Sequence, residues 1–294
     1  MSQGFHGVVL LDKPSGESSF QTLGAVKRRL GIRRVGHAGT LDPFATGLLV
    51  ALCGCCTRMA SVVESMDKEY EARMVFGLKT DTLDPEGSVV ERGTVPAVEE
   101  VVRALEAFRG EIEQQPPAFS AVHVAGRRAY DVARRGGKVE LGARRVAVHE
   151  LELLEFAPPH LRFRLRCGRG TYVRALARDL ATSLGTCGSL VELRRVRVGC
   201  FHVESAVAPQ GFEPERDLMR PAELARRYGV PAMATLRAEY VERVRHGAPL
   251  EDRFFDVAPP EGAIAAVYGD AEGLVALVER REGCYRYRAV LSQY

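Results

Sequence analysis

GHAGTLDPFATG, residues 36–47, separates a basic segment from the apolar run 48–53. Its three glycines and Pro43 argue against a regular helix or strand. Pro43 biases Asp42 toward an extended backbone, and the glycines permit conformations or close approaches that a side chain would prevent. We therefore expect a rigid loop, anchored on both sides, that presents one carboxylate.

Asp42 is isolated, because no other acidic residue lies between Glu17 and Glu64. A lone carboxylate on a stiff loop can act as a nucleophile, a general base or a metal ligand. It can equally cap a turn, with His37 bonded to backbone, and the spacing leaves both interpretations open. A metal site would need further ligands, and no nearby His or Glu accompanies His37 and Asp42.

Length and composition are typical of a soluble globular protein. Of the 294 residues, 46% are hydrophobic and 27% charged, and no apolar run reaches the roughly 20 residues that span a membrane. The N-terminal sequence lacks the basic region and long apolar core of a secretory signal, so we expect a cytoplasmic protein. The seven irregularly spaced cysteines favour reduced thiols over a disulfide framework.

Positive charge is concentrated in two segments, although the net charge is only +3. Residues 162–197 contain nine arginines against Asp179 and Glu192. A second group precedes the quoted loop and comprises Lys27, Arg28, Arg29, Arg33 and Arg34. Such clusters are typical of a protein that binds a polyanion. The alternative is that the arginines lie on solvated faces and are balanced by acidic residues of other segments.

Hydrophobic periodicity predicts a strand and a helix before the loop. The apolar run 7–12 predicts a buried strand. Ser18 and Gln21 have capping-box spacing, and Gly31 is placed to end the helix that follows. Four apolar residues recur at helical spacing between these ends, namely Phe20, Leu23, Val26 and Leu30.

After the loop, strict alternation predicts half-buried strands over 69–77, 144–156 and 161–167. In the last of these, Arg162, Arg164 and Arg166 should share the outward face. Helices are predicted over 98–109, 127–135 and 172–184. After Tyr240, short apolar runs with tight turns predict a small β-rich module that contains a hairpin.

Several motifs, taken in order, resemble those of the TruB family, the bacterial tRNA pseudouridine-55 synthases. The matching segments are GVVLLDKPSG (7–16), VGHAGTLDPFATGLL (35–49), DKEYEA (67–72), KTDTLDPEG (79–87), CGRGTYVRALARDL (167–180) and LVELRRVRVG (190–199). The resemblance covers roughly residues 4–205. The match in the glycine-rich loop is long and specific, whereas the shorter motifs mean little alone.

The resemblance, rather than periodicity, implies the topology. It implies an α+β pseudouridine synthase catalytic fold over residues 1–235, with a mixed, largely antiparallel sheet flanked by helices. Residues 236–294, which contain VRHGAPL, resemble more loosely the small β-barrel-like PUA domain that binds RNA behind this catalytic domain.

The resemblance also implies an activity. The enzyme would flip out the uridine at position 55 of the tRNA T arm, break its N1 glycosidic bond, rotate the uracil and rejoin it through C5. No metal, nucleotide or redox cofactor is implied. We expect a monomer whose partner is the T-arm stem-loop of tRNA, with no membrane association and no obligate protein partner. An RNA-binding or RNA-folding protein with a secondary pocket, and a metal-dependent hydrolase that uses His37 and Asp42, remain as alternatives.

Three positions match the family's catalytic residues. Asp42 matches the essential aspartate, which would act as a nucleophile or as the base that starts an elimination. Tyr70 matches the residue that stacks on the target base and later accepts a proton. Arg174 matches the arginine that pairs with the catalytic carboxylate and would keep it ionised.

Five further positions match residues that the family uses to bind the substrate. Tyr172 and Leu193 would line the pocket, and His37 would help to hold the T loop. Lys13 and Pro14 would support the pocket. Phe119 is a departure, because it stands where a tyrosine is common in the family.

Overall fold

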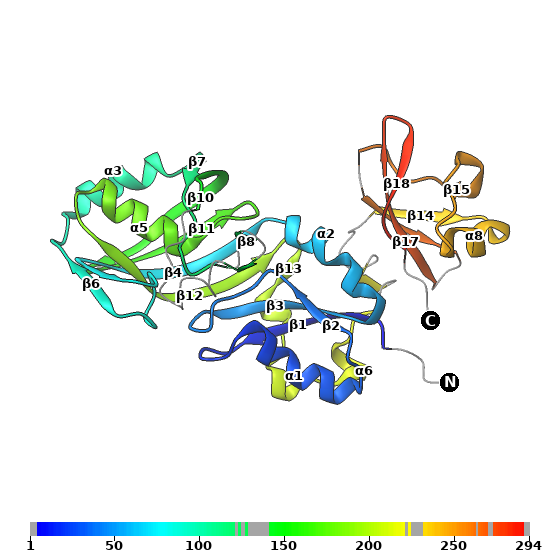
Figure 1. Cartoon of the computed structure of the whole chain (residues 1–294), viewed down its shortest axis with the longest axis horizontal. Coiled ribbons are helices and arrows are strands. Elements are labelled where there is room, and N and C mark those ends of the chain that lie inside the picture. The colour runs from blue at the N-terminus through cyan, green and yellow to red at the C-terminus, as the bar shows by residue number, and fades with distance from the viewer. Residues whose placement is uncertain are drawn as a thin grey trace.

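The fold is built on one large sheet and one smaller sheet (Figure 1). The computed structural model describes residues 5–120, 123–124, 127–128, 141–220, 223–224, 232–262, 264–269 and 273–290. The order of the large sheet is β1 (Gly7–Lys13), β3 (Thr46–Cys53), β12 (Gly188–Val198), β4 (Lys68–Phe76), β11 (His160–Cys167), β10 (Arg144–Ala157) and β7 (Gly110–Gln114). β2 (Val35–Ala38) pairs with β3, and β13 (Phe201–His202) pairs with β12.

This sheet is mixed and largely antiparallel, as predicted. Among its described pairs only β12 and β3 run parallel, with Arg194 opposite Thr46 and Arg195 opposite Gly47. Gly47 has a φ of +99°, and a Cβ there would lie 2.3 Å from the carbonyl oxygen of Arg195. Glycine is therefore required where these two strands meet.

The remaining elements are helices and small two-stranded sheets. The helices are α1 (Ser19–Leu30), α2 (Ala60–Ser65), α3 (Val98–Ala107), α5 (Val173–Ser183), α6 (Pro214–Asp217) and α8 (Val241–Arg245). The 3-10 turns are η1 (Gly54–Met59), η2 (Val203–Ser205), η3 (Pro209–Gly211), η4 (Ala238–Tyr240) and η5 (Asp252–Phe254). β5 (Leu78–Thr80) pairs with β6 (Val89–Arg92), and β8 (His123–Val124) pairs with β9 (Arg127–Arg128). No helix in the described ranges is long and apolar enough to cross a bilayer.

Two predictions from local sequence need correction. Arg127 and Arg128 pair with Val124 and His123 as strands, so the helix predicted over 127–135 is wrong at its start. The rest of that segment lies outside the described residues. The glycine-rich stretch is also less irregular than predicted, because residues 36–38 belong to β2 and pair with β3, and residues 46–47 begin β3.

α1 follows its predicted boundaries. The Ser18 side chain caps the helix together with Gln21, and Gly31 ends it in the left-handed conformation with a φ of 62°. Leu23, Val26 and Leu30 are buried. Phe20 was predicted to share their face but is 68% exposed. Its ring instead packs under the Lys27 ammonium, 4.1 Å from the ring centroid.

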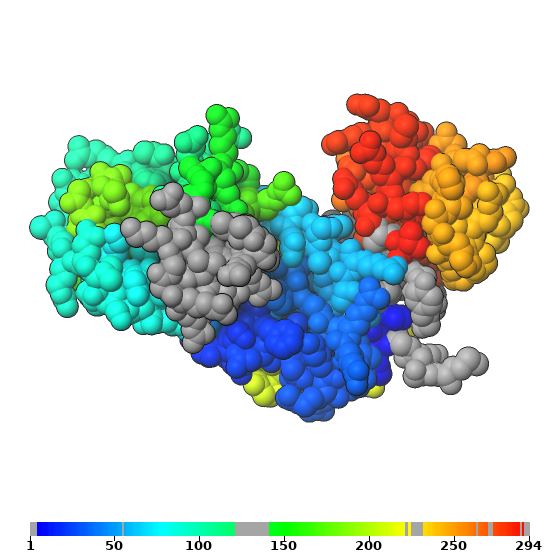
Figure 2. Space-filling view, in the orientation of Figure 1, coloured from blue at the N-terminus to red at the C-terminus, as the bar shows by residue number. Residues whose placement is uncertain are grey.

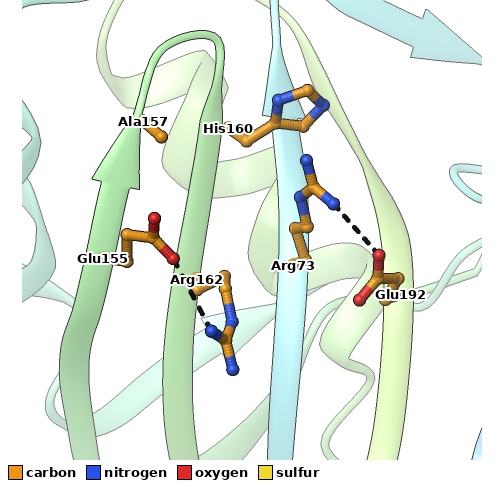
Figure 3. Close-up of a pocket in the computed structure, with 6 residues that line it drawn as sticks. All are labelled: Arg73, Glu155, Ala157, His160, Arg162 and Glu192. Carbon is orange, nitrogen blue, oxygen red and sulfur yellow. Dashed lines mark hydrogen bonds and ion pairs between the residues drawn. The ribbon is translucent and has the colours of Figure 1, made fainter.

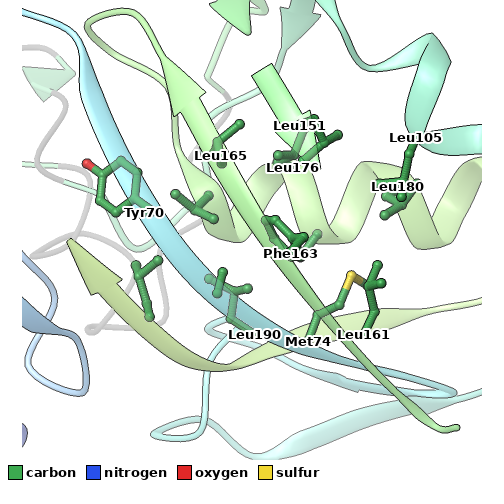
Figure 4. Close-up of a cluster of buried hydrophobic side chains, with 14 of the residues drawn as sticks. Tyr70, Met74, Leu105, Leu151, Leu161, Phe163, Leu165, Leu176, Leu180 and Leu190 are labelled. Carbon is green, nitrogen blue, oxygen red and sulfur yellow. The ribbon is translucent and has the colours of Figure 1, made fainter. Parts of the chain in front are cut away.

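A hydrophobic cluster fills the space between the large sheet and helices α3 and α5 (Figure 4). Alternate residues of β4 point into it, which confirms the predicted strand. Its labelled members are Tyr70, Met74, Leu105, Leu151, Leu161, Phe163, Leu165, Leu176, Leu180 and Leu190. The Tyr70 ring is thus packed among the apolar side chains of this core.

The opposite face of β11 carries the predicted arginines, but their charge is balanced. Arg162, Arg164 and Arg166 each form an ion pair with a glutamate of β10, and Arg164 also pairs with two glutamates of β4. Register explains this, because β11 lies between two strands that carry glutamates on the same face. The expected polyanion-binding stripe is therefore a solvated face of alternating charges, which was the alternative interpretation.

The C-terminal residues form the smaller sheet, which is a separate lobe in Figure 2. Its order is β15 (Phe255–Val257), β14 (Ala232–Leu236), β16 (Ile264–Tyr268), β17 (Leu274–Arg281) and β18 (Cys284–Val290). β16 and β17 form the predicted hairpin. The sheet has its own core around Phe254, and Ala266 and Leu277 also join the cluster that contains Val8 and Met59. The predicted β-rich module is confirmed as a five-stranded sheet.

Candidate active site

The loop that carries Asp42 connects β2 to β3 and is held by hydrogen bonds from the buried side chain of Lys13. Lys13, fully buried at the end of β1, donates hydrogen bonds to the carbonyls of Pro14 (2.8 Å), Pro43 (3.0 Å) and Ala45 (2.7 Å). Burial lowers the pKa of Lys13 to about 8. Because three carbonyls share one ammonium, Lys13 and Pro14 hold the loop in one conformation.

Ser19 fixes the residue that precedes Asp42. Its hydroxyl donates to the Leu41 carbonyl at 3.0 Å and accepts from the Leu41 amide at 2.9 Å. Ser19 is the first residue of α1 and is 3% exposed. The helix start therefore determines the path of the loop backbone at Asp42.

Arg174 joins Asp42 to a second carboxylate. One guanidinium nitrogen donates to Asp42 Oδ1 at 2.8 Å and to the Phe119 carbonyl at 2.9 Å. The other donates to Asp84 Oδ2 at 3.2 Å and to the Thr82 carbonyl at 2.9 Å. The side chains of Arg174 and Asp84 are both 4% exposed, whereas that of Asp42 is 31% exposed. The arrangement orients one accessible carboxylate from a buried support.

The protonation of Asp42 reflects opposing influences. Burial raises the pKa of the Asp42 carboxyl, and the nearby charge of Asp84 adds to this effect. The guanidinium of Arg174, through its charge and its hydrogen bond, and the ammonium of Lys13 act in the opposite direction. The carboxylate form of Asp42 therefore depends on Arg174.

Tyr70 and Leu193 lie on neighbouring strands beside this loop. They belong to the same hydrophobic cluster as Leu41 and Ala45, which flank Asp42 in sequence. Tyr70 is 8% exposed and Leu193 is 7% exposed. Burial raises the pKa of the Tyr70 phenol, so its hydroxyl is neutral at physiological pH. The site thus combines a flat ring, an apolar wall and one carboxylate.

Tyr172 precedes α5, two residues before Arg174. Its amide donates to Gln114 Oε1 at 2.8 Å, and its carbonyl accepts from Gln114 Nε2 at 3.2 Å. The Arg144 guanidinium lies over the Tyr172 ring, 4.9 Å from its centroid. These contacts fix the start of α5 and hence the position from which Arg174 reaches the loop.

His37 lies in β2, opposite Ala51 of β3. Its Nδ1 atom is buried and has no hydrogen-bond partner among the described residues. Burial, and secondarily the charge of Arg195, lowers the pKa of His37, so the ring is neutral at physiological pH. The structure therefore places His37 at the start of the loop. Among the described residues, no hydrogen bond or ion pair joins His37 to Asp42.

Three residues that sequence reasoning missed shape the site. Asp84 lay in a segment interpreted only as a turn, and Ser19 followed the capping residue without a signal of its own. Arg195 was counted only as one of nine arginines, although it is 1% exposed. Whether an arginine is buried depends on strands that are distant in sequence. The signal for Arg195 within β12 is its spacing of two residues from the buried Leu193, which places both side chains on the same face.

A cavity of about 330 Å³ lies on the outer face of the large sheet (Figure 3). The ion pairs Arg73–Glu192 and Arg162–Glu155 line it together with Ala157 and His160. Arg73 alternates with the inward residues of β4, so this cavity is on the side opposite Tyr70. Among the described residues, no three His, Cys, Asp or Glu side chains are grouped to hold a metal ion.

Solved structures with the same fold are found at low sequence identity. The chain is similar to one in the crystal structure of the archaeal box H/ACA sRNP Nop10–Cbf5 complex, with a TM-score of 0.72 and 22% identity. The similarity covers 98% of this chain and 86% of the other. A Cbf5–Nop10–Gar1 complex gives a TM-score of 0.69 at 24% identity. These similarities confirm the α+β fold with its mixed sheet.

Sequence relatives are closer. "tRNA pseudouridine synthase B" of Cupriavidus pinatubonensis (strain JMP 134 / LMG 1197) is 41% identical over 294 residues, covering 96% of this chain and 92% of the relative. The protein of the same name from Mycobacterium sp. (strain KMS) is 40% identical over 276 residues, covering 90% and 92%. Residues 27–173 match the family described as TruB family pseudouridylate synthase (N terminal domain). The chain therefore belongs to the TruB family of pseudouridylate synthases.

Proposed function

We propose that this chain isomerises uridine to pseudouridine at position 55 in the T arm of tRNA, as a monomer. The observation that carries the proposal is the Asp42–Arg174 ion pair at 2.8 Å, on a loop held by Lys13 and Ser19. A fixed, partly exposed carboxylate beside an aromatic ring and an apolar wall suits chemistry on a base that has left its stack. Relatives of the same family that carry the name tRNA pseudouridine synthase B support this substrate.

The reaction can be written with two roles for Asp42. As a nucleophile, its carboxylate attacks C1′ of the sugar and is displaced again when the C5–C1′ bond forms. As a base, it removes a proton from C2′ to start an elimination and returns that proton to C2′ when the C5–C1′ bond forms. In both cases the N1–C1′ bond breaks and its electron pair remains on the uracil. The uracil rotates, a C5–C1′ bond forms, and the proton on C5 is then removed. Arg174 keeps Asp42 ionised for the first step, and Asp84 orients Arg174.

The other matched residues contribute binding and shape. The Tyr70 ring provides a flat partner for the base, and its oxygen is the acceptor for the C5 proton. Leu193 and Tyr172 exclude water, so that the detached uracil is neither hydrolysed nor lost. His37, Lys13 and Pro14 hold the loop edge against which the flipped nucleotide rests.

The surface for RNA is at the end of α1 rather than on the balanced face of β11. Four basic residues there form no ion pair within the described ranges, namely Lys27, Arg28, Arg29 and Arg33. The exposed Phe20 ring lies beside Lys27 and offers a surface on which a base can stack. This cluster would bind phosphates of the T arm and so orient the RNA, without recognising its base sequence.

The smaller sheet is the candidate for a second RNA-binding unit. Its hairpin β16–β17 and the segment VRHGAPL support a PUA-like domain. We place its boundary before Ala232, a few residues ahead of the expected division at 235/236, because β14 pairs with β15 and β16 rather than with the large sheet.

Replacement of Asp42 by Asn tests the proposal. With a T-arm stem-loop, we expect this variant to bind the RNA with unchanged affinity and to form no pseudouridine, detected by a pseudouridine-specific chemical label. Asp12→Asn is the matched control, because Asp12 pairs with Arg194 on the outer face and should leave activity intact. Substantial pseudouridine formation by purified Asp42→Asn would contradict the proposed chemistry. Inactivity of the unmodified chain would favour an RNA-binding or RNA-folding role instead.

A further inference from the structure

Arg195 is a buried cation whose charge has no carboxylate partner. Its side chain is 1% exposed, and among the described residues no Asp or Glu oxygen lies within 4.0 Å of it. Arg174, the other buried arginine of the site, has two carboxylate partners. Burial of a charge without a counter-ion is unfavourable, and ionisable groups in such surroundings are concentrated at functional sites.

The guanidinium of Arg195 binds both ends of the catalytic loop. Its Nε donates to the Leu48 carbonyl at 2.7 Å, and a terminal nitrogen donates to the Gly39 carbonyl at 3.0 Å. Gly39 precedes Asp42, and Leu48 follows it in β3. Gly39 has a φ of +83°, and a Cβ there would come within 3.3 Å of the guanidinium. Glycine therefore allows the loop to close onto Arg195.

The same side chain reaches Tyr70. Arg195 and Tyr70 are directly opposite each other in the antiparallel pair β12–β4. Directly opposite residues present their side chains on the same face of a sheet, and the positive charge of Arg195 opposes the rise that burial causes in the pKa of Tyr70. Arg195 thus connects the loop of Asp42 with the ring beside it.

We propose that Arg195 is a positioning residue for the isomerisation, which fixes the Tyr70 oxygen relative to the Asp42 loop and balances the charge of the Tyr70 phenolate. This inference depends on the proposed function. When the C5–H bond breaks, its electron pair restores the ring double bond and its proton passes to the Tyr70 oxygen. That oxygen must be a phenolate at this moment, having earlier released its own proton to solvent, and Arg195 supplies the opposite charge.

The surroundings of Tyr70 make this assignment specific. The groups that influence it from packed elements are Arg195 on β12, Cys167 on β11 and Asp42 in the loop. Burial raises the pKa of Cys167 to about 12, so its thiol stays neutral. Besides burial, the charge of Arg195 also lowers the pKa of Lys13, His37 and Lys68, none of which supplies a negative charge. Arg195 is thus the group that favours the phenolate.

The test replaces Tyr70 with 3,5-difluorotyrosine, whose phenol is more acidic, and follows its ionisation by 19F NMR. Arg195→Met should move the midpoint of the phenol titration to higher pH, because it removes the positive charge. Arg195→Lys keeps the charge and should leave the midpoint near its original value. Arg194→Met is the matched control, because Arg194 is the preceding residue, pairs with Asp12 and is 41% exposed. A midpoint that Arg195→Met leaves in place would overturn the proposal.

Kinetics on a T-arm stem-loop provide the second readout. Arg195→Met should lower kcat by about 10- to 100-fold, the loss expected for a charged hydrogen bond, with KM unchanged. In a Tyr70→Phe background the same change should add little, because the partner is already absent. If Arg195→Met does not fold, Arg195→Gln decides, because it keeps a donor for the loop carbonyls and removes the charge: a lowered kcat supports the proposal, and a full kcat overturns it. The 19F titration does not require turnover. If the unmodified chain forms no pseudouridine, that result contradicts the proposed function but leaves the influence of Arg195 on Tyr70 to be decided by the titration.

Discussion

The two faces of the large sheet use arginine in opposite ways. On the inner side, Arg174 and Arg195 are buried and converge on one loop. On the outer side, Arg162, Arg164 and Arg166 are half-exposed and alternate with glutamates. A side chain of one type therefore organises a site where water is excluded, and only balances charge where water is present. The predictions below separate these two uses.

Replacement of Arg174 by Gln should have the largest effect. It leaves Asp84 buried without its cation, and removal of one partner of a buried pair costs about 3–5 kcal/mol. We expect a loss of this size in the free energy of unfolding, measured by urea denaturation, together with loss of pseudouridine formation. Arg164→Gln on the outer face is the control. Equal losses in both variants would show that the faces do not differ.

The acid limb of the pH profile should respond to Arg174. In the proposed mechanism only the carboxylate form of Asp42 reacts, so we expect kcat/KM to fall as pH decreases through the Asp42 pKa, which burial raises. Arg174→Lys cannot contact both carboxylates as the forked guanidinium does, so Asp42 loses stabilisation of its ionised form. We expect the midpoint to move to higher pH by about one unit. A shift to lower pH, or the same shift in Arg164→Lys, would contradict this reasoning.

A neutral contact on the inner side should matter less than the charged one. Ser19→Ala removes both hydrogen bonds to Leu41, and we expect about 1–2 kcal/mol less stability and a lower kcat. Ser15→Ala removes one exposed contact with the Phe44 carbonyl and serves as the matched control. Thermal unfolding and single-turnover kinetics compare the stability and the rate of Ser19→Ala with those of Ser15→Ala. Equal values for the two variants would show that Ser19 does not hold the loop.

The outer face should give the smallest effect. Replacement of Arg162, Arg164 and Arg166 by Gln should cost less than about 1 kcal/mol for each pair, because exposed ion pairs contribute little. It should also leave the salt dependence of RNA binding unchanged. Replacement of Lys27, Arg28 and Arg29 by Gln should instead weaken binding and reduce the slope of affinity against salt. Filter binding over a range of salt concentrations distinguishes the two clusters.

Local chemistry explains what could be predicted from the sequence. The capping box of α1 and the alternation in β4 are short-range signals, and both are confirmed. The family resemblance anticipated that Arg174 would reach Asp42, across 132 positions of sequence. Periodicity alone would have assigned Tyr70 and Leu193 to the core, and they do lie in it.

What could not be predicted depends on pairing between distant strands. Arg194 and Arg195 are adjacent and chemically identical, yet one faces Asp12 and the other the catalytic loop. The glutamates that balance Arg164 come from β4 and β10, so their effect is invisible in the composition of β11. Phe20 shows the same limit, because helical spacing does not reveal where the neighbouring surface ends.

The residues of the candidate site come from both sides of the parallel junction between β3 and β12. Asp42 comes from the segment before this junction, whereas Tyr70, Arg174 and Leu193 belong to segments on its far side. Neither side contains all four of these residues. During refolding, enzymatic competence should therefore return later than secondary structure, at the rate with which the two sides dock through Gly47.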